Sequence, residues 1–319
     1  MGHFYLLCRV KLKLDFDITP SPIAVNWPSF FLMGSCFASN QGTKLANAGF
    51  DVITNPFGII YNPVSMATLL YRIAKPQFYA VDDFIQHGKF FSLEHHGDYK
   101  YDSLQEAINT SNAILSSSVS KLCKADVVVL TFGTSLVFHH LQLQKIAGNC
   151  HTLPNKDFEV LQLHFDTVKS TIQNCIKSVR KVNENAHIIL TVSPIRHIKS
   201  GVVNNSRSKA NLIAALHEAL AEENNASYFP AYEIFIDELR DYRFAKEDLT
   251  HPTDLAVDYI YDRFTSTYFS KNTLSIADEV SKFQRFAAHR PMSSPELHLT
   301  QVTEKRRELL HKYPFLHLK

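Results

Sequence analysis

The sequence predicts an α/β protein, a three-layer α/β/α sandwich built around a five-stranded parallel sheet. Two observations predict it: five short apolar runs are continuous rather than alternating, and segments with helical spacing lie between them. Continuous apolar runs are typical of parallel strands that are buried on both faces. Because strands and helices alternate, right-handed crossovers between parallel strands are expected. The expected strands are residues 30–33, 50–54, 127–132, 188–192 and 228–230.

Amphipathic helices are expected between and after these strands, because apolar positions there recur every three to four residues. The long stretch between the second and third strands differs from the rest. It contains the aromatic-rich segment 78–91, followed by His95 and His96, and we expect it to form an insertion or lid over the carboxyl edge of the sheet. The expected helices are residues 39–48, 158–180, 205–221 and 253–264.

A single domain is expected over residues 1–319, because no linker, internal repeat or low-complexity stretch divides the chain. Its core is expected at about residues 25–270. Residues 271–319 are expected to form a helical C-terminal extension, broken at Arg290-Pro291, that packs back on the domain. A hydrophobic content of 45% and a charged content of 20% exclude a disordered or fibrous protein.

Charge and hydropathy exclude several classes of partner. The formal net charge is +2, and no run of Lys and Arg has the density of a nucleic-acid-binding arm. No apolar run reaches the roughly 18 residues that a membrane span requires. The apolar stretch at residues 4–8 is too short for the core of a signal peptide. We therefore expect no nucleic acid and no membrane among the partners.

The cysteines indicate a reducing compartment. An oxidising compartment would leave one of five cysteines unpaired, so reduced thiols in a cytoplasmic protein are the simpler expectation. None forms a CxxC pair, so neither a zinc ribbon nor a thioredoxin-type motif is indicated. We expect no metal and no other cofactor. The cysteines are Cys8, Cys36, Cys123, Cys150 and Cys175.

In a parallel α/β sheet, function gathers in the loops at the carboxyl ends of the strands. The first such loop reads Gly34-Ser35-Cys36, with two candidate nucleophiles directly before a helix. A helix N-terminus lowers the pKa of a thiol and offers free N–H groups to an oxyanion. The alternative is that Cys36 is a buried small apolar residue, as most free cysteines are.

Two further loops carry glycine or hydroxyl groups after a strand. Asn55 and Gly58 lie in the second loop, which is either a simple turn or a place where the Gly58 N–H faces the first loop. Gly133 and Ser135 follow the third strand. The Ser135 hydroxyl has the alternative role of a helix cap.

The last loop places an acid and a base together. Pro252 disfavours a helical conformation at His251 and suits the first turn of the following helix, so His251 is expected on a loop at a helix start. Asp248 lies three residues earlier, where it can bind Nδ1 of His251 and leave Nε2 free to act as a base. The alternative is an aspartate that caps a turn beside a surface histidine.

Together, the loops resemble the ordered sequence blocks of the SGNH (GDSL-like) hydrolases. That superfamily has a nucleophile in Gly-Asp-Ser, an oxyanion glycine in a second block, Gly-x-Asn in a third and Asp-x-x-His near the C-terminus. More closely, the chain is similar to the GSCFA family, named for the motif that stands here at residues 34–38. The resemblance covers residues 30 to 290, with further matches at residues 55–58, 149–151, 193–197, 205, 208–209 and 228–251.

The resemblance implies a role for each matching residue. Cys36 stands in the nucleophile position, and Ser35 is the alternative nucleophile. Asp248 and His251 match the last block without change, as the orienting acid and the base.

The resemblance also implies an oxyanion hole, in which the N–H groups of Cys36 and Gly58 hold the tetrahedral oxyanion. Gly133 and Ser135 match the third block, where Ser135 replaces the asparagine of the superfamily and is expected to assist.

Substrate-binding residues are expected at the same edge of the sheet. Arg196 and His197 end the fourth strand, where an acidic group of the substrate would lie between them, and Asn55 lies in the second loop. A structural role is expected for residues 149–151, because three residues do not complete a zinc site.

The expected function is that of an esterase acting on a small-molecule or carbohydrate ester, such as an O-acetyl group, through a covalent acyl-enzyme. With Cys36 as nucleophile the intermediate is a thioester, so acyl transfer is an alternative, whereas Ser35 would favour hydrolysis. A non-catalytic binding module on the same fold is a second alternative, because fold does not fix function. A dinucleotide-binding oxidoreductase has little support, because no GxGxxG follows the first strand.

Overall fold

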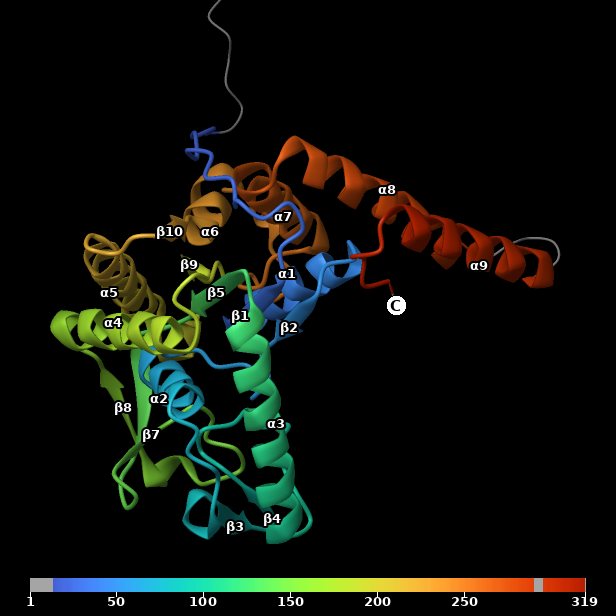
Figure 1. Cartoon of the computed structure of the whole chain (residues 1–319). Helices are drawn as coiled ribbons and strands as arrows, with labels where there is room; N and C mark the ends of the chain where they lie inside the picture. The colour runs from blue at the N-terminus through green and yellow to red at the C-terminus, as the bar shows by residue number, and fades with distance from the viewer. Residues whose placement is uncertain (1–13, 290–294, 319) are drawn as a thin grey trace, which may run out of the picture.

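The structure is a computed structural model that describes residues 14–289 and 295–318. Its centre is a five-stranded parallel sheet, which confirms the predicted fold class (Figure 1). The strand order is β10-β9-β5-β1-β2, so the direction of progression reverses between β1 and β5. In open α/β sheets, ligands bind outside the carboxyl ends of the strands at this reversal point. The strands are β1 (Phe30–Gly34), β2 (Val52–Thr54), β5 (Val127–Phe132), β9 (His187–Val192) and β10 (Ala226–Phe229).

Strand β1 shows why helices cover both faces of the sheet. Successive side chains of a strand point to opposite faces. Phe31 and Met33 therefore lie in one hydrophobic core, and Phe30 and Leu32 lie in the other. All four side chains are buried, so both faces need a covering layer.

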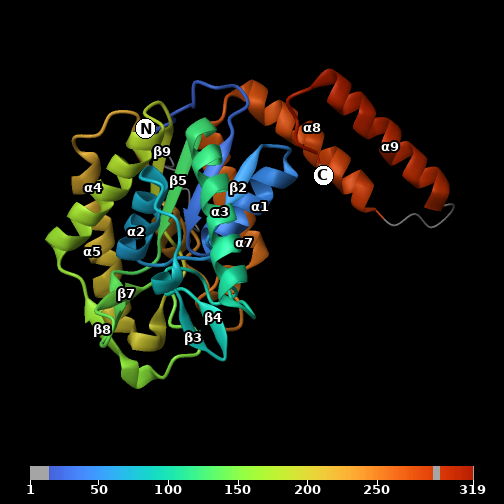
Figure 2. The ribbon, with the colours of Figure 1, turned by 60° about the horizontal axis from the view of Figure 1, so that its bottom comes forward.

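The two helical layers complete the predicted three-layer sandwich. Helices α2, α3, α4 and α5 pack on the face that carries Phe31, and α1 and α7 pack on the opposite face. Figure 2 shows α2 and α4 on one side of the sheet and α1 and α7 on the other. The helices are α1 (Cys36–Asn47), α2 (Pro63–Ala74), α3 (Leu104–Lys124), α4 (Phe165–Val182), α5 (Val202–Leu220), the short α6 (Ala231–Glu233) and α7 (Asp254–Tyr268).

Residues 158–162 are a strand, so the prediction of a helix over residues 158–180 is wrong in its first part. Strand β8 (Phe158–Gln162) pairs antiparallel with β6 (Leu136–His140), which also pairs with β7 (Lys145–Ala147). Helix α4 begins only at Phe165. Periodicity alone separates strand from helix poorly over five apolar-rich residues, and pairing with β6 decides the outcome.

The stretch between β2 and β5 contains two helices that the sequence did not predict, α2 and α3. Between them lies a hairpin of β3 (Ile85–His87) and β4 (Lys89–Phe91). After this hairpin the N–H of His96 donates to the carbonyl of Phe57 at 3.0 Å. The stretch therefore packs against the loop that follows β2, at the carboxyl edge of the sheet. Short turns of 3-10 or π type complete the chain: Val81–Asp83, Asn155–Asp157, Ile198–Ser200, Ile234–Glu238 and Tyr242–Phe244.

Two C-terminal helices, α8 (Lys271–Ala288) and α9 (Pro295–Lys312), extend sideways from the sheet domain (Figure 1). The predicted break at Arg290-Pro291 lies outside the described residues. After α9 the chain returns to the domain, where the N–H of His317 donates to the carbonyl of Gly49 at 2.8 Å. A small hydrophobic core holds this extension together; its buried members are Ile276, Val280, Phe283, Leu309, Leu316 and Leu318.

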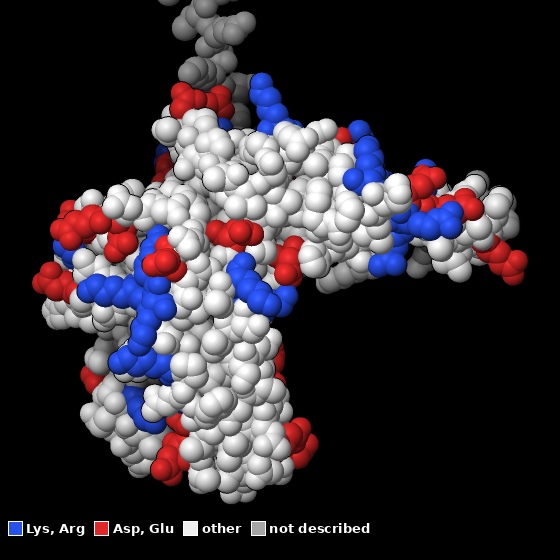
Figure 3. All heavy atoms as spheres, viewed as in Figure 1, with Lys and Arg blue, Asp and Glu red and all other residues white. Residues whose placement is uncertain are grey.

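The face drawn in Figure 3 mixes basic and acidic side chains with wide uncharged areas. Over residues 14–289 and 295–318, no helix has the length and apolarity needed to cross a bilayer.

Gly34, the last residue of β1, lies where there is no room for a side chain. Its φ is +139°, and a Cβ there would lie 2.1 Å from the carbonyl oxygen of Thr131. We expect Gly34→Ala to lower the free energy of unfolding by about 3 kcal/mol or more, because backbone on a neighbouring strand cannot move aside.

Gly88→Ala is the matched control for this prediction. Gly88 also has a positive φ, +71°, but no atom lies within 4 Å of an added Cβ. Its expected cost in urea denaturation is about 1 kcal/mol, from backbone strain alone. Equal losses in the two variants would contradict the steric account of Gly34.

Candidate active site

The loop between β1 and α1 places Ser35 and Cys36 in different environments. Ser35 is fully buried, and its Oγ accepts the N–H of Phe37 at 3.2 Å, so the hydroxyl caps α1. Cys36 is the first residue of α1 and is partly exposed. The capping role of Ser35 leaves Cys36 as the nucleophile candidate that a substrate can reach.

The Cys36 thiol is protonated at rest. Burial raises its pKa, and this outweighs its own N–H, the N–H of Phe37 and the charges of Lys209 and Lys246, which all lower it. A helix N-terminus alone therefore does not make this thiol a thiolate. Nucleophilic attack by Cys36 needs a base that takes the proton.

The base candidate, His251, is oriented by Asp248. Nδ1 of His251 lies 2.5 Å from Oδ2 of Asp248, and the N–H groups of His251 and Thr250 both donate to Oδ1 at 2.9 Å. These backbone hydrogen bonds, with the His251 side chain, hold the pKa of Asp248 well below its usual range. Asp248 thus stays ionised, fixes the Nδ1–H tautomer and leaves Nε2 free. Leu249, with φ at +57°, makes the tight turn that brings the two side chains together.

Arg196 holds the His251 loop rather than standing free. Its Nη2 donates to the carbonyl of Leu249 at 2.6 Å, between Asp248 and His251. The N–H of Lys246 also donates to the carbonyl of His251, at 2.7 Å. Nη2 of Arg196 therefore stabilises the loop that carries His251. The predicted contact of Arg196 with substrate stays a prediction. Its Nε is buried without a hydrogen-bond partner.

Asn55 connects the first and second loops. Its Oδ1 accepts the N–H of Gly34 at 2.8 Å, and its Nδ2 donates to Oγ of Ser39 at 2.8 Å. Only 8% of the residue is exposed. The amide of Asn55 thus holds the loop of Ser35 and Cys36 in place, and its predicted contact with substrate stays a prediction.

Three of the four groups predicted for the oxyanion hole donate to acceptors within the protein. The N–H of Gly58 donates to the carbonyl of Asn55 at 2.8 Å, and the N–H of Gly133 donates to the carbonyl of Tyr61 at 2.7 Å. The N–H of Ser135 donates to Oγ of Ser208 at 2.7 Å, and the Ser135 side chain is fully buried. This corrects the three oxyanion assignments, because backbone and serine acceptors already satisfy these groups.

His197 supplies a polar atom that lies beside Gly133. An added Cβ on Gly133 would lie 3.0 Å from Nε2 of His197, which is buried and has no hydrogen-bond partner. Burial, helped by the charges of Lys209 and His251, lowers the pKa of His197 to about 4. The ring is therefore neutral at pH 7. Asn205 fixes its backbone by accepting the N–H of His197 at 2.8 Å.

Two residues of the site were not predicted from the sequence, Tyr61 and Lys209. The Tyr61 ring meets the His197 ring edge to face, with 4.9 Å between centroids, and its pKa is raised by burial and by Cys36. Lys209 is buried and its charge acts on Cys36 and on His197. Lys209 was among the matches to the GSCFA family at residues 208–209, but the resemblance gave it no role.

Helices α1 and α7 bring the nucleophile and base elements together. They lie on the same face of the sheet, and an ion pair between Lys44 and Asp258 joins them. Cys36 starts α1, and His251 lies three residues before α7 begins. Within the described part of the chain no hydrogen bond joins Cys36 to His251; such contacts often tighten only when substrate binds.

Cavities adjoin these loops. One, of about 370 Å³, is lined by residues that include Ser39, one turn along α1 from Cys36. Another, of about 310 Å³, lies between Arg196 and the segment before the His251 loop. The residues lining the first are Ser39, Thr54, Asn55, Gly58, Ile59, His96, Asp98 and Tyr99.

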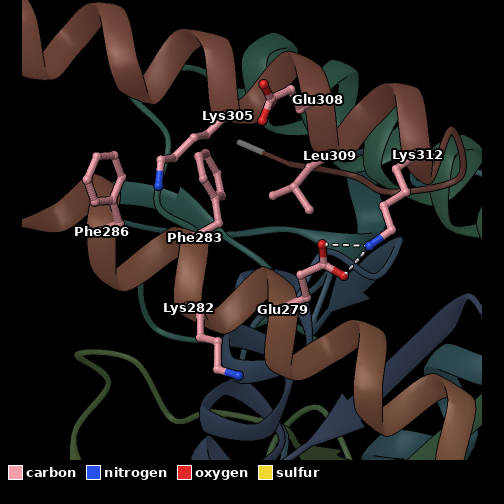
Figure 4. A pocket seen from close by; sticks show the side chains of 8 residues that line it. All are labelled: Glu279, Lys282, Phe283, Phe286, Lys305, Glu308, Leu309 and Lys312. Carbon is pink, nitrogen blue, oxygen red and sulfur yellow. Dashed lines mark hydrogen bonds and ion pairs between the residues drawn. The ribbon is translucent and has the colours of Figure 1, made fainter.

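A third cavity, of about 330 Å³, lies between α8 and α9, on the extension (Figure 4). Glu279 and Lys312 close one end with an ion pair at 2.9 Å, and Lys305 lies over the ring of Phe286 at the other. Its lining holds no residue of the Cys36 or His251 loops. In residues 14–289 and 295–318, no three His, Cys, Asp or Glu side chains are grouped as metal ligands.

The strand order and the two helical layers define an α/β protein with a three-layer sandwich around a parallel sheet. The chain belongs to the GSCFA family, whose model matches residues 29–264. No curated protein matches the sequence.

Three solved structures are similar to this chain at low identity. The first is a Clostridium thermocellum family 3 carbohydrate esterase, with 10% identity, a TM-score of 0.36, and 80% of this chain and 98% of that chain covered. The second is a Corynascus thermopiles (Myceliophthora fergusii) carbohydrate esterase family 2 enzyme with a carbohydrate-binding domain. It has 11% identity and a TM-score of 0.41, and the match covers 83% of this chain and 68% of that chain. The third is an acetyl xylan esterase from the rumen bacterium Butyrivibrio proteoclasticus, with 12% identity, a TM-score of 0.37, and coverage of 76% and 66%.

Ser35→Ala separates a cap from a nucleophile. Loss of the hydrogen bond to Phe37 is expected to lower the free energy of unfolding by about 1 kcal/mol in urea denaturation. The control is Ser103→Ala, which removes the equivalent cap of α3, where Oγ accepts the N–H of Glu106. A Ser35→Ala variant as stable as the wild type would contradict the capping role.

Proposed function

We propose that this protein is an acyl-transfer enzyme of the esterase type, with Cys36 as nucleophile, His251 as base and Asp248 as the residue that orients His251. The observation that carries the proposal is the 2.5 Å contact between Asp248 and Nδ1 of His251. It leaves Nε2 as the free basic atom on a loop at the same edge of the sheet as Cys36. A protonated thiol beside a free imidazole nitrogen is what general-base catalysis requires.

In the first half-reaction, Nε2 of His251 takes the proton from Sγ of Cys36 as sulfur attacks the acyl carbon. A C–S bond forms and the carbonyl oxygen becomes an oxyanion. Collapse of this intermediate breaks the ester C–O bond, and the alcohol leaves with the proton from His251. Cys36 then carries the acyl group as a thioester.

Two donors remain for the oxyanion. The N–H of Cys36 is the first of α1 and has no intrahelical acceptor. The second donor is Nε2 of His197, in the neutral tautomer that carries its proton there. This atom is buried beside Gly133 and has no hydrogen-bond partner. We assign these two groups to the oxyanion hole, in place of the committed N–H groups of Gly58 and Gly133 and of Ser135.

In the second half-reaction, His251 deprotonates an acceptor that attacks the thioester. Water gives hydrolysis, and an alcohol, amine or thiol gives acyl transfer. The cavity of about 370 Å³ beside Ser39 is lined by hydroxyl, amide, imidazole and carboxylate groups. Such a lining suits a polyhydroxylated leaving group, so we propose a small ester such as an O-acetylated carbohydrate as substrate. A reduced thiol at Cys36 is consistent with a cytoplasmic protein.

A non-catalytic binding module is the second candidate. The observation that favours it is the commitment of three expected oxyanion donors to internal hydrogen bonds. The oriented Asp248–His251 pair favours the enzyme instead, because a binding protein has no physical need of a free, oriented base.

Acylation of Cys36 tests the nucleophile. With 4-nitrophenyl acetate we expect a burst of nitrophenol and an acetyl thioester on Cys36, detected by mass spectrometry of the quenched protein. Cys36→Ala is expected to abolish both, while Cys123→Ala, which removes an exposed thiol on α3, leaves them unchanged. Fluorophosphonate labelling of Ser35 would show that Ser35, not Cys36, is the nucleophile. If neither an acyl adduct nor turnover is detected, the result would contradict the enzyme and favour the non-catalytic binding module.

Asp248→Asn tests the orienting role. The amide places an N–H against Nδ1 of His251 and so favours the wrong tautomer, and we expect kcat to fall by about 10² to 10⁴. The control is Asp278→Asn, which removes an exposed carboxylate on α8 that pairs with Lys282. A kcat of Asp248→Asn equal to that of the wild type would contradict the assignment.

A further inference from the structure

A second pair of histidine and aspartate, His96 and Asp98, lies in the loop after β4. Nδ1 of His96 lies 3.0 Å from Oδ2 of Asp98 and 3.4 Å from the backbone nitrogen of Asp98, so the carboxylate is the nearer partner. A carboxylate at Nδ1 favours the tautomer that leaves Nε2 of the neutral ring as a hydrogen-bond acceptor. Among the residues that the structure describes, none forms a hydrogen bond with this Nε2. The Asp98 side chain is 87% exposed, and such an exposed contact adds little to stability, so folding alone does not account for the pair.

The loop after β2 holds His96 in a fixed place. Gly58 in that loop has a φ of +80°, and an added Cβ there would lie 2.2 Å from Cβ of His96. The N–H of His96 donates to the carbonyl of Phe57 at 3.0 Å, and the hydroxyl of Tyr99 donates to the carbonyl of Pro56 at 2.8 Å. The absence of a side chain at Gly58 therefore makes the room that His96 occupies.

Asn55 joins this pair to the nucleophile loop. Its side chain lines the cavity of about 370 Å³, which His96 and Asp98 also line. On its other side Asn55 accepts the N–H of Gly34 at 2.8 Å, and its Nδ2 donates to the carbonyl of Ser35 at 3.5 Å. The cavity is thus separated by one side chain from the residue that precedes Cys36. This position beside the nucleophile suits the part of a substrate that lies beyond its acyl group.

The polar groups of the cavity fit hydroxyl groups. The carboxylate of Asp98 and Nε2 of His96 are acceptors, and Oγ of Ser39 accepts Nδ2 of Asn55 at 2.8 Å, so its hydroxyl can donate to a ligand. The lining, as far as the structure describes it, has one carboxylate and no lysine or arginine. A phosphate or carboxylate group in the cavity would meet Asp98 with no cation to balance it, whereas a hydroxyl both donates and accepts. The ring of Tyr99 adds an apolar surface on which the carbon face of a sugar can lie.

We propose that His96 and Asp98 bind the alcohol part of the ester, and that this part is an uncharged polyol or sugar. This assignment rests on the proposed function, because the acyl group must lie at Cys36 for the alcohol part to reach the cavity. Nε2 of His96 accepts a hydrogen bond from one substrate hydroxyl, and the carboxylate of Asp98 accepts one from a second. His96 is therefore a specificity-determining residue, and His251 remains the base.

The first test compares two acetyl esters, methyl 6-O-acetylglucoside and 4-nitrophenyl acetate, whose alcohol part has no further hydroxyl. The measured quantity is the ratio of kcat/KM for the sugar ester to kcat/KM for the nitrophenyl ester. We expect His96→Phe to lower this ratio about tenfold, the size of one lost hydrogen bond. His96→Gln, whose amide brings a polar group near the position of Nε2, is expected to restore most of it. Near-UV circular dichroism confirms that each variant is folded, and a wild-type ratio in both folded variants would overturn the proposal.

His87→Phe is the matched control. His87 is an exposed histidine on β3 and does not line the cavity, so the same chemical change is made away from the proposed subsite. We expect its ratio to equal that of the wild type. An equal fall in His87→Phe and His96→Phe would contradict a specific role of His96.

The second test needs no turnover. Isothermal titration calorimetry measures binding of methyl 6-O-acetylglucoside and of methyl glucoside 6-phosphate to Cys36→Ala, which cannot form the thioester. We expect the neutral ester to bind, the phosphate to bind at least tenfold more weakly, and His96→Phe in the same background to weaken binding of the ester about tenfold. No binding of the ester, or equal binding of the phosphate, would overturn the proposal. Binding that depends on His96, in a protein without esterase activity, would uphold the subsite and reject the proposed function alone.

Discussion

The carboxyl edge of this sheet depends on the close approach of Gly34 to the Thr131 carbonyl on β5. Because Gly34 has no side chain, β1 stays paired with β5 up to its own last residue, opposite Thr131. The N–H of Gly34 is then free to bind the amide of Asn55 from the next loop. This contact fixes the positions of the next two residues. Ser35 caps α1, and Cys36 is the first residue of that helix.

The central sheet was predictable because its signal is local. All five predicted strands are present, since continuous apolar runs such as Phe31 to Met33 have no stable alternative to burial on both faces. The segment of β8 was not predictable, because its strand state depends on pairing with β6, at a distance in sequence that periodicity does not report. Helices α2 and α3 were not predicted, because the aromatic-rich stretch was expected only to form an insertion or lid.

The candidate site was predictable in its residues more than in its bonds. The order and spacing of the motifs predicted that Cys36, Asp248 and His251 lie at one edge of the sheet. The spacing did not show that the N–H groups of Gly58 and Gly133 donate to the carbonyls of Asn55 and Tyr61. Hydrogen-bond partners across loops are set by tertiary structure. Helical spacing places Lys209 on the buried stripe of α5, three residues before Leu212 and seven before Leu216, but spacing does not show which atom its amine contacts there.

The raised pKa of the Cys36 thiol also bears on oxidation. Peroxides attack the thiolate, and the thiol reacts slowly. Since burial keeps the proton on Cys36 until a base removes it, the side chain is protected from sulfenic acid formation while the site is idle. Under the proposed mechanism Cys36 would be ionised only during turnover, and the side chain would remain intact in a protein that meets oxidants.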